Sequence, residues 1–131
     1  MIHVCSLAAL PETVRQTGAS HVLTVMANVE QVLNFVRGWD RAAPLVIHCY
    51  AGVSRSTASA FAAACMLNPH RDEMEIARKL RAASPIASPN RLIVSLADKA
   101  LGREGRMVRA LEGIGPASMM VEGKPFLVEL E

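Results

Sequence analysis

Residues 44–67 constrain the fold of this chain more than any other segment. An apolar run at 44–47 is followed by the short loop 48–56, which contains one glycine, and then by an alanine-rich run at 57–67. The first run is typical of a buried strand, and the second is typical of a central helix covered on most sides. A strand that feeds a helix through so short a loop directs backbone N–H groups and the positive end of the helix at one point.

Strand and helix patterns alternate over the N-terminal part of the chain. Apolar and β-branched runs predict three strands, and apolar residues at helical spacing predict two helices between them. The predicted strands are 2–7, 21–26 and 45–49, and the predicted helices are 10–18 and 29–41. This order implies parallel pairing through right-handed crossovers. We expect an α/β fold with a small parallel or mostly parallel sheet, flanked by helices, and a site at the C-terminal edge of the strands.

Further helices are expected after the loop. Asn68-Pro69 ends the alanine-rich helix, and Asp72 with Glu75 predicts a capping box for a helix that continues to residue 83. Two more helices are predicted at 88–101 and 104–112. Residues 1–112 are therefore expected to form the functional domain. Residues 113–131, punctuated by glycine and proline, are expected to form a C-terminal extension or tail.

The composition limits the partners. The 131 residues carry a net charge of only +2, which argues against a nucleic acid or a membrane as the partner. Three cysteines, an odd number, and a start without signal-peptide features favour a reducing compartment, so we expect a soluble cytoplasmic protein. The histidines His3, His21 and His70 show no ligand spacing, so we expect no metal and no other cofactor.

Cys49 is the candidate nucleophile. A thiolate attacks far better than a thiol, and N–H groups between a strand end and a helix start favour negative charge on the sulfur. Arg55 adds a permanent positive charge and a planar fork that suits a phosphate. Gly52 lets the backbone turn and come close to phosphate oxygens. The pattern favours attack by Cys49 on a phosphoryl group, followed by hydrolysis of the phosphocysteine by water.

The neighbouring loop residues have supporting roles in this hypothesis. Ser56 is expected to donate a hydrogen bond to the sulfur when it leaves in the second step. His48 is expected to bond to the backbone and hold the loop rather than act as a base. The Tyr50 ring either contacts the substrate or turns away into packing. The loop residues expected to bind the substrate are Tyr50, Ala51, Gly52, Val53, Ser54 and Arg55.

The segment 48–56 resembles the signature loop of the cysteine-dependent protein tyrosine phosphatases: histidine, cysteine, five residues, arginine, then serine or threonine. It looks most like the loop of the small dual-specificity group, which often reads His-Cys-x-Ala-Gly-x-Ser-Arg-Ser. The resemblance implies Cys49 as the nucleophile, Arg55 as the phosphate clamp and Ser56 as the stabiliser of the leaving thiolate. The order of elements over 2–101 fits the family more loosely, and residues 113–131 are not matched.

The same resemblance extends to Ser88-Pro89-Asn90, which looks like the Pro-Asn turn that these phosphatases place beside the loop. It implies that Asn90 supports the loop and belongs to the substrate-binding residues, although Arg91-Leu92 replaces the usual Gly-Phe. Phosphoinositide phosphatases of the superfamily tend to carry lysines inside the loop, and this loop has none. The implied partner is a phosphorylated protein or a small aryl phosphate, and phosphate or sulfate is expected to be able to occupy the loop.

A general acid is missing from its usual place. The family protonates the leaving oxygen with an aspartate on a separate loop well before the cysteine, whereas this chain has no aspartate before Asp40. We expect Asp40 at the opposite edge of the sheet, and Asp72 and Asp98 on helices. Glu30 opens a helix at the correct edge and is the better substitute, although the helix dipole alone also favours a glutamate there.

The connection before that helix is unusually short. Only Ala27 and Asn28 lie where the family has a further strand and the acid loop. One hypothesis is that the chain is this short and acts best on aryl phosphates with good leaving groups. The other, which we favour, is that an acid loop is missing from the sequence at this point, since functional loops are often the least ordered segments.

Two other functions fit parts of the pattern. A phosphate-binding pseudophosphatase would keep the loop and lack the acid. A sulfur transferase, as in rhodanese-like domains, shares a cysteine at the start of a loop, but Arg55-Ser56 at the end of the loop argues against it.

Overall fold

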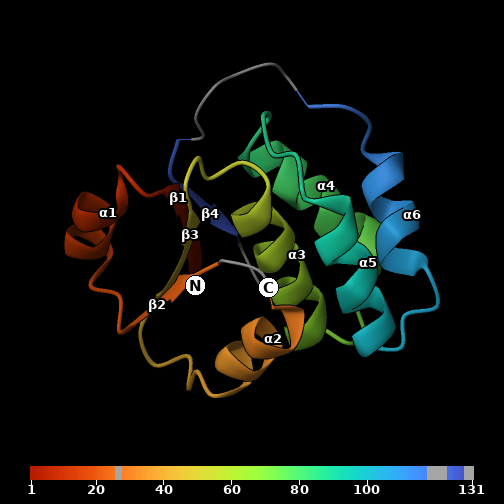
Figure 1. The fold of residues 1–131 in the computed structure, drawn as a ribbon, viewed down its shortest axis with the longest axis horizontal. Helices are drawn as coiled ribbons and strands as arrows, with labels where there is room; N and C mark the ends of the chain where they lie inside the picture. The colour runs from red at the N-terminus through yellow and green to blue at the C-terminus, as the bar shows by residue number, and fades with distance from the viewer. Residues whose placement is uncertain (26–27, 118–123, 129–131) are drawn as a thin grey trace.

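The computed structural model describes residues 1–25, 28–117 and 124–128. Within these ranges the chain forms a four-stranded sheet and six helices, an α/β architecture (Figure 1). The strands are β1 (Ile2–Ser6), β2 (His21–Thr24), β3 (Leu45–Cys49) and β4 (Phe126–Val128). The helices are α1 (Leu10–Thr17), α2 (Val29–Arg37), α3 (Arg55–Leu67), α4 (Glu73–Ala83), α5 (Arg91–Ala100) and α6 (Arg106–Gly113).

The sheet is open and mixed, with the strand order β2-β3-β1-β4. Both β1 and β2 pair parallel with β3, and Ile2 and His21 each lie opposite Leu45. The C-terminal ends of these three strands therefore meet at one edge. β4 pairs antiparallel with β1, with Ile2 opposite Val128. The expected parallel pairing of the first three strands is confirmed, and the sheet as a whole is not parallel.

The helices are divided unequally between the two faces of the sheet. α1 covers one face, and the other five helices lie on the opposite side (Figure 1). α3 lies against β1 and β3 and contacts α2, α4 and α5 around it. Its residues 56–65 are all buried, as the alanine-rich run predicts, because small side chains let neighbouring elements approach from every side.

Several element boundaries differ from the predictions: α5 begins at Arg91 rather than at residue 88, and α6 begins at Arg106 rather than at residue 104. α2 ends at Arg37 rather than near residue 41, because the chain turns at Gly38 and the Trp39 indole N–H donates to the Ala43 carbonyl at 2.8 Å. The predicted capping box of α4 is wrong in its second half. Asp72 caps the helix by accepting from the Met74 N–H at 3.0 Å. The Glu75 carboxylate, the second half of the predicted box, bonds elsewhere. Glu75 forms an ion pair with Arg71.

The C-terminal part differs from the expected tail. Residues 126–128 form the edge strand β4, and Val128 is buried in the core. These three residues are therefore part of the sheet rather than a tail. Residues 118–123 and 129–131 lie outside the described residues. Among the described helices, none combines the length and the apolar character that crossing a membrane requires.

Candidate active site

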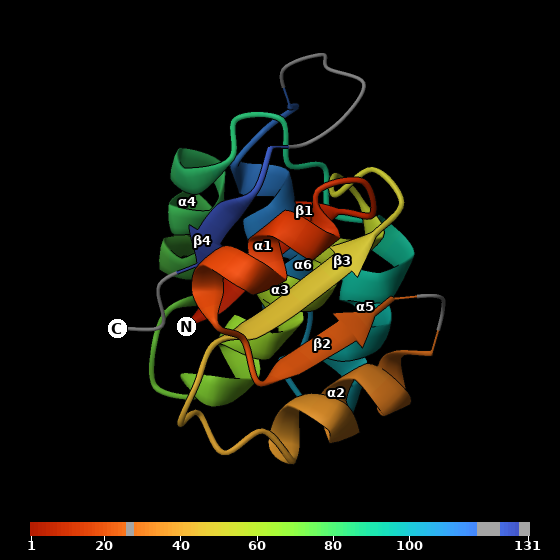
Figure 2. The same ribbon diagram turned by 90° about the vertical axis from the view of Figure 1, so that its left-hand side faces the viewer.

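The loop of residues 49–55 lies where β3 ends and α3 begins, at the edge where the three parallel strands end (Figure 2). Three carbonyls of this loop point outward and accept hydrogen bonds from backbone N–H groups elsewhere. The N–H and C=O groups of a trans peptide point in opposite directions, so these contacts turn the N–H groups of residues 51, 54 and 55 inward. The loop thus forms a concave set of donors suited to an anion. The outer bonds are Leu7 to Tyr50 at 3.0 Å, Ser88 to Val53 at 2.9 Å and Asn90 to Ser54 at 3.1 Å.

Cys49 lies at the base of this loop. Its side chain is buried, its Sγ lies 3.1 Å from the Ser56 Oγ, and the Gly52 N–H donates to the sulfur at 3.3 Å. Burial raises the pKa of the Cys49 thiol, but hydrogen bonds from the Ser56 hydroxyl and from the backbone N–H groups of Ser56, Gly52 and Val53 outweigh it. The net effect lowers the pKa of Cys49 from its ordinary value, which favours the thiolate.

Gly52 allows the loop to close against β1. Its φ of 72° lies in the left-handed region that side chains other than glycine disfavour. A Cβ at this position would lie 2.8 Å from the backbone carbon of Cys5 and 2.8 Å from the backbone nitrogen of Ser6. Both the conformation and the close approach to β1 therefore require glycine. The sequence predicted the turn but not the contact with β1.

His48 supports the loop through a side chain rather than through the backbone. Its Nε2 lies 2.6 Å from the Thr24 hydroxyl on β2, and the two residues are register partners in the sheet. The expected bond from the His48 ring to the backbone is therefore not formed. The buried Nδ1 has no hydrogen-bond partner among the described residues. The sequence did not single out Thr24, although its place near the end of the second predicted strand aligns it with the end of the third.

Arg55 and Tyr50 are both available to a ligand. Arg55 is half-buried in the first turn of α3, and its guanidinium makes no hydrogen bond or ion pair within the part of the chain that the structure describes. Tyr50 is 76% exposed, which excludes the alternative that its ring turns into packing.

A further residue that the sequence did not indicate, Thr57, holds the loop from the helix side. Its hydroxyl donates to the Val53 carbonyl at 2.5 Å.

Asn90 supports the loop through its backbone. Its backbone N–H holds the Ser54 carbonyl, while its side chain caps α5 by accepting from the Ile93 N–H at 3.0 Å. The side-chain oxygen is therefore engaged at α5, and the backbone N–H places Asn90 beside the loop as expected. Its role in substrate binding stays a prediction.

The candidate acids lie apart from the loop. Asp40 accepts from the Ala42 N–H at 3.0 Å before β3 begins, which is the opposite edge of the sheet, as expected. Asp98 is buried and caps α6 by accepting from the Met107 N–H at 2.7 Å. Within the described residues, no hydrogen bond or ion pair joins a carboxylate to residues 49–55. Residues 26–27, where the missing acid loop is expected, are outside the described part.

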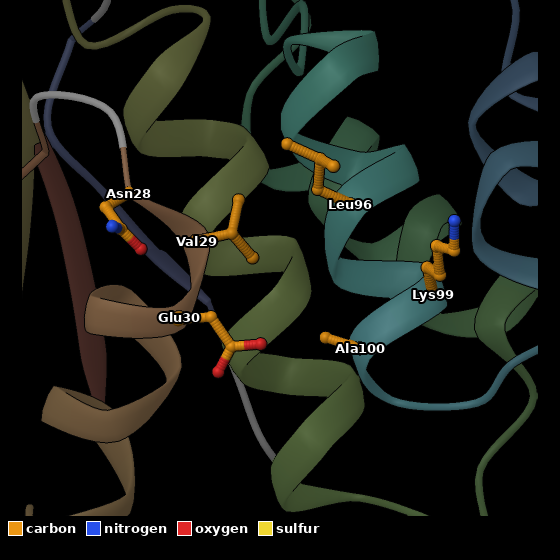
Figure 3. Close-up of a pocket in the computed structure, with 6 residues that line it drawn as sticks. All are labelled: Asn28, Val29, Glu30, Leu96, Lys99 and Ala100. Atoms are coloured by element: carbon orange, nitrogen blue, oxygen red, sulfur yellow. The ribbon is translucent and has the colours of Figure 1, made fainter.

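Glu30 faces a separate cavity. Figure 3 shows its carboxylate between α2 and α5, in a cavity of about 400 Å³ that Leu96, Lys99 and Ala100 also line. The lining residues come from these two helices and the N-cap of α2, Asn28, and include no residue of the 49–55 loop. The structure thus groups Glu30 with Lys99 rather than with Cys49.

Comparison with known proteins adds no relative: no protein-family model, no curated protein and no solved structure matches the chain. The geometry around Cys49 is therefore the basis for assigning a function.

Proposed function

We propose that this chain is a phosphomonoesterase that works through a phosphocysteine on Cys49, in the manner of the protein tyrosine phosphatases whose loop it resembles. The observation that carries the proposal is the sulfur held between the Gly52 N–H and the Ser56 hydroxyl at the base of an N–H-lined loop. Such a loop stabilises both a thiolate and the equatorial oxygens of a phosphoryl group in transfer. Arg55, without a partner among the described residues, supplies a fork for two of those oxygens.

The proposed reaction has two displacements. In the first, the Cys49 thiolate attacks phosphorus, a P–S bond forms, and the P–O bond to the leaving group breaks. The leaving oxygen then takes a proton from solvent or from an acid. In the second, water attacks phosphorus, the P–S bond breaks, and the Ser56 hydroxyl donates a hydrogen bond to the departing thiolate. The substrate class is a phosphorylated protein side chain or an aryl phosphate. No metal takes part.

A reducing environment suits this chemistry. Cys5, Cys49 and Cys65 are all free and buried, and none of them forms a disulfide. A thiolate nucleophile is lost on oxidation. These observations support a cytoplasmic location for the proposed enzyme.

The second candidate function is phosphate binding without turnover. The observation that favours it is the lack of a carboxylate in contact with the loop within the described residues. The two functions differ in turnover of 4-nitrophenyl phosphate with EDTA present. An enzyme turns over this substrate, Cys49→Ser abolishes the turnover, and phosphate still binds to the variant. A binding protein shows phosphate binding and no turnover in either form.

A chemical test of the loop itself uses iodoacetate. Cys49 should be carboxymethylated before Cys5 and Cys65, because burial raises the pKa of both of those thiols, that of Cys65 to about 12. Inorganic phosphate should protect Cys49. Equal alkylation with and without phosphate would count against an anion site in the loop.

A further inference from the structure

The segment that joins α4 to α5 holds one side of the candidate loop. Its Ser88 N–H donates to the Val53 carbonyl at 2.9 Å, and its Asn90 N–H donates to the Ser54 carbonyl at 3.1 Å. These two bonds turn the N–H groups of residues 54 and 55 toward the site. The position of residues 88–90 therefore controls the direction of two anion-binding donors.

Arg81, in the last turn of α4, gathers the carbonyls of this segment. Its Nη1 donates to the Ala87 carbonyl at 2.6 Å and to the Pro85 carbonyl at 3.0 Å, and it lies 3.5 Å from the Ser84 carbonyl. Its Nη2 donates to the Gly115 carbonyl at 3.0 Å, just beyond α6. One guanidinium thus joins the α4–α5 segment to the end of α6.

The Arg81 side chain is half-buried, and the burial of its Nε makes its carbonyl contacts important. The Arg81 Nε is fully buried without a hydrogen-bond partner among the described residues, so the side chain has lost water at that atom. Backbone carbonyls that converge on one point repel each other unless a cation lies between them. A guanidinium satisfies this need because it is always charged and presents several N–H groups in a fixed plane.

We infer that Arg81 is a positioning residue for the anion site: it holds residues 84–87 so that the Ser88 and Asn90 N–H groups orient the Val53–Arg55 peptides toward the ligand. The role of Arg81 in catalysis rests on the proposed phosphatase function, whereas its role in anion binding depends only on the geometry of the loop. Arg81 itself does not touch the ligand. It acts through two successive sets of hydrogen bonds, the first from its guanidinium to backbone carbonyls and the second between backbone groups.

The helix offers a matched control. Arg78 is exposed on the same helix, three residues before Arg81, and it makes no hydrogen bond or ion pair in the described part of the chain. Arg78→Ala removes the same charge and the same side chain from α4 without touching residues 84–87. Arg81→Lys keeps the charge and offers one ammonium in place of the fork, so it is expected to restore part of the effect.

The test measures four quantities in wild type, Arg81→Ala, Arg81→Lys and Arg78→Ala. They are the pH midpoint of Cys49 alkylation by iodoacetamide, the phosphate concentration that halves the alkylation rate, kcat and KM for 4-nitrophenyl phosphate, and Tm. Arg81→Ala should raise the pH midpoint of alkylation and weaken phosphate protection by about tenfold. This is the effect expected from the loss of one hydrogen bond to a charged ligand. Arg81→Lys should fall between, and Arg78→Ala should match wild type in all readouts except small changes in Tm.

The outcomes separate the two proposals. A folded Arg81→Ala with the wild-type alkylation midpoint and phosphate protection would overturn the role of Arg81, whatever the turnover. If Arg81→Ala does not fold, Arg81→Lys decides by the same two readouts, and wild-type values there would also overturn it. Wild-type protein that binds phosphate without turnover would overturn the phosphatase function alone, because the alkylation and protection measurements still report on Arg81.

Discussion

The sulfur of Cys49 and the hydroxyl oxygen of Ser56 lie 3.1 Å apart, so the end of β3 and the first turn of α3 meet at the candidate nucleophile. When Cys49 is ionised, the hydroxyl donates to the thiolate, and this bond helps to lower the pKa of Cys49. The same bond favours the thiolate as a leaving group. One contact therefore serves both halves of the proposed reaction.

Ser56→Ala should therefore raise the pKa of Cys49 and slow hydrolysis of the phosphocysteine by about 10- to 100-fold, since a hydrogen bond to a charged group contributes roughly 1.5–3 kcal/mol. Stopped-flow turnover of 4-nitrophenyl phosphate should show a burst of nitrophenol in this variant, followed by a slow steady state. Ser59→Ala is the matched control. The Ser59 hydroxyl is buried in the same helix and donates to the Arg55 carbonyl rather than to the sulfur. Equal kinetics for Ser56→Ala and Ser59→Ala would refute the role of Ser56.

The lowered pKa of Cys49 also predicts how stability depends on pH. Because the folded thiol ionises more readily than the unfolded one, ionisation stabilises the fold. This contribution is complete above the ordinary pKa of 9.0 and is lost as the pH falls through the lowered value. The difference in unfolding free energy between wild type and Cys49→Ser should therefore shift in favour of wild type as the pH rises toward 9.0. Urea unfolding at a series of pH values measures it, and a constant difference would contradict the shift.

Gly52→Ala should destabilise the protein and abolish phosphate protection. The left-handed conformation alone costs a non-glycine residue about 1–3 kcal/mol, and contacts of 2.8 Å with the backbone of β1 add to this cost. Gly102→Ala is the control, because Gly102 has a φ of 67° and no atom lies within 4 Å of its added Cβ. Urea unfolding should show a larger loss for Gly52→Ala by at least about 2 kcal/mol. Similar losses at the two positions would show that the loop is not packed against β1.

The separation of carboxylates from the loop predicts a strong dependence on the leaving group. Without an acid at the leaving oxygen, kcat/KM should fall steeply from 4-nitrophenyl phosphate to phenyl phosphate and to an alkyl phosphate. Glu30→Gln should leave this series unchanged, because Glu30 faces the cavity between α2 and α5. A flat series would mean that an acid reaches the site, and its loss in Glu30→Gln would identify that acid as Glu30.

The sequence predicted the elements that local patterns determine. β3 and the end of α3 lie where the apolar and alanine-rich runs place them, because a buried strand and a buried helix each carry a strong periodic signal. The pairing of β4 with β1 was not predictable in this way. It joins residues at opposite ends of the chain, and three residues carry too little periodicity to indicate a strand.

The sequence predicted the residues around the Cys49 sulfur, but it did not predict the contacts that hold the loop in place. The spacing of Cys49, Gly52 and Ser56 was enough to place them together, since a short loop between a strand and a helix leaves few arrangements. The loop is held by the backbone N–H groups of Leu7 and Ser88, and the Arg81 guanidinium binds backbone carbonyls of the neighbouring segment. Backbone contacts leave no residue-type signal in a sequence.

The most direct test of the central claim is to look for phosphate bound covalently to Cys49. Protein mixed with 4-nitrophenyl phosphate, quenched during turnover and digested, is analysed by mass spectrometry, with Cys49→Ser treated in parallel. We expect one added phosphoryl group on the peptide that contains Cys49, its accumulation in Ser56→Ala, and its absence from Cys49→Ser. Turnover with no phosphorylated Cys49 peptide in wild type or in Ser56→Ala, or undiminished turnover by Cys49→Ser, would contradict it.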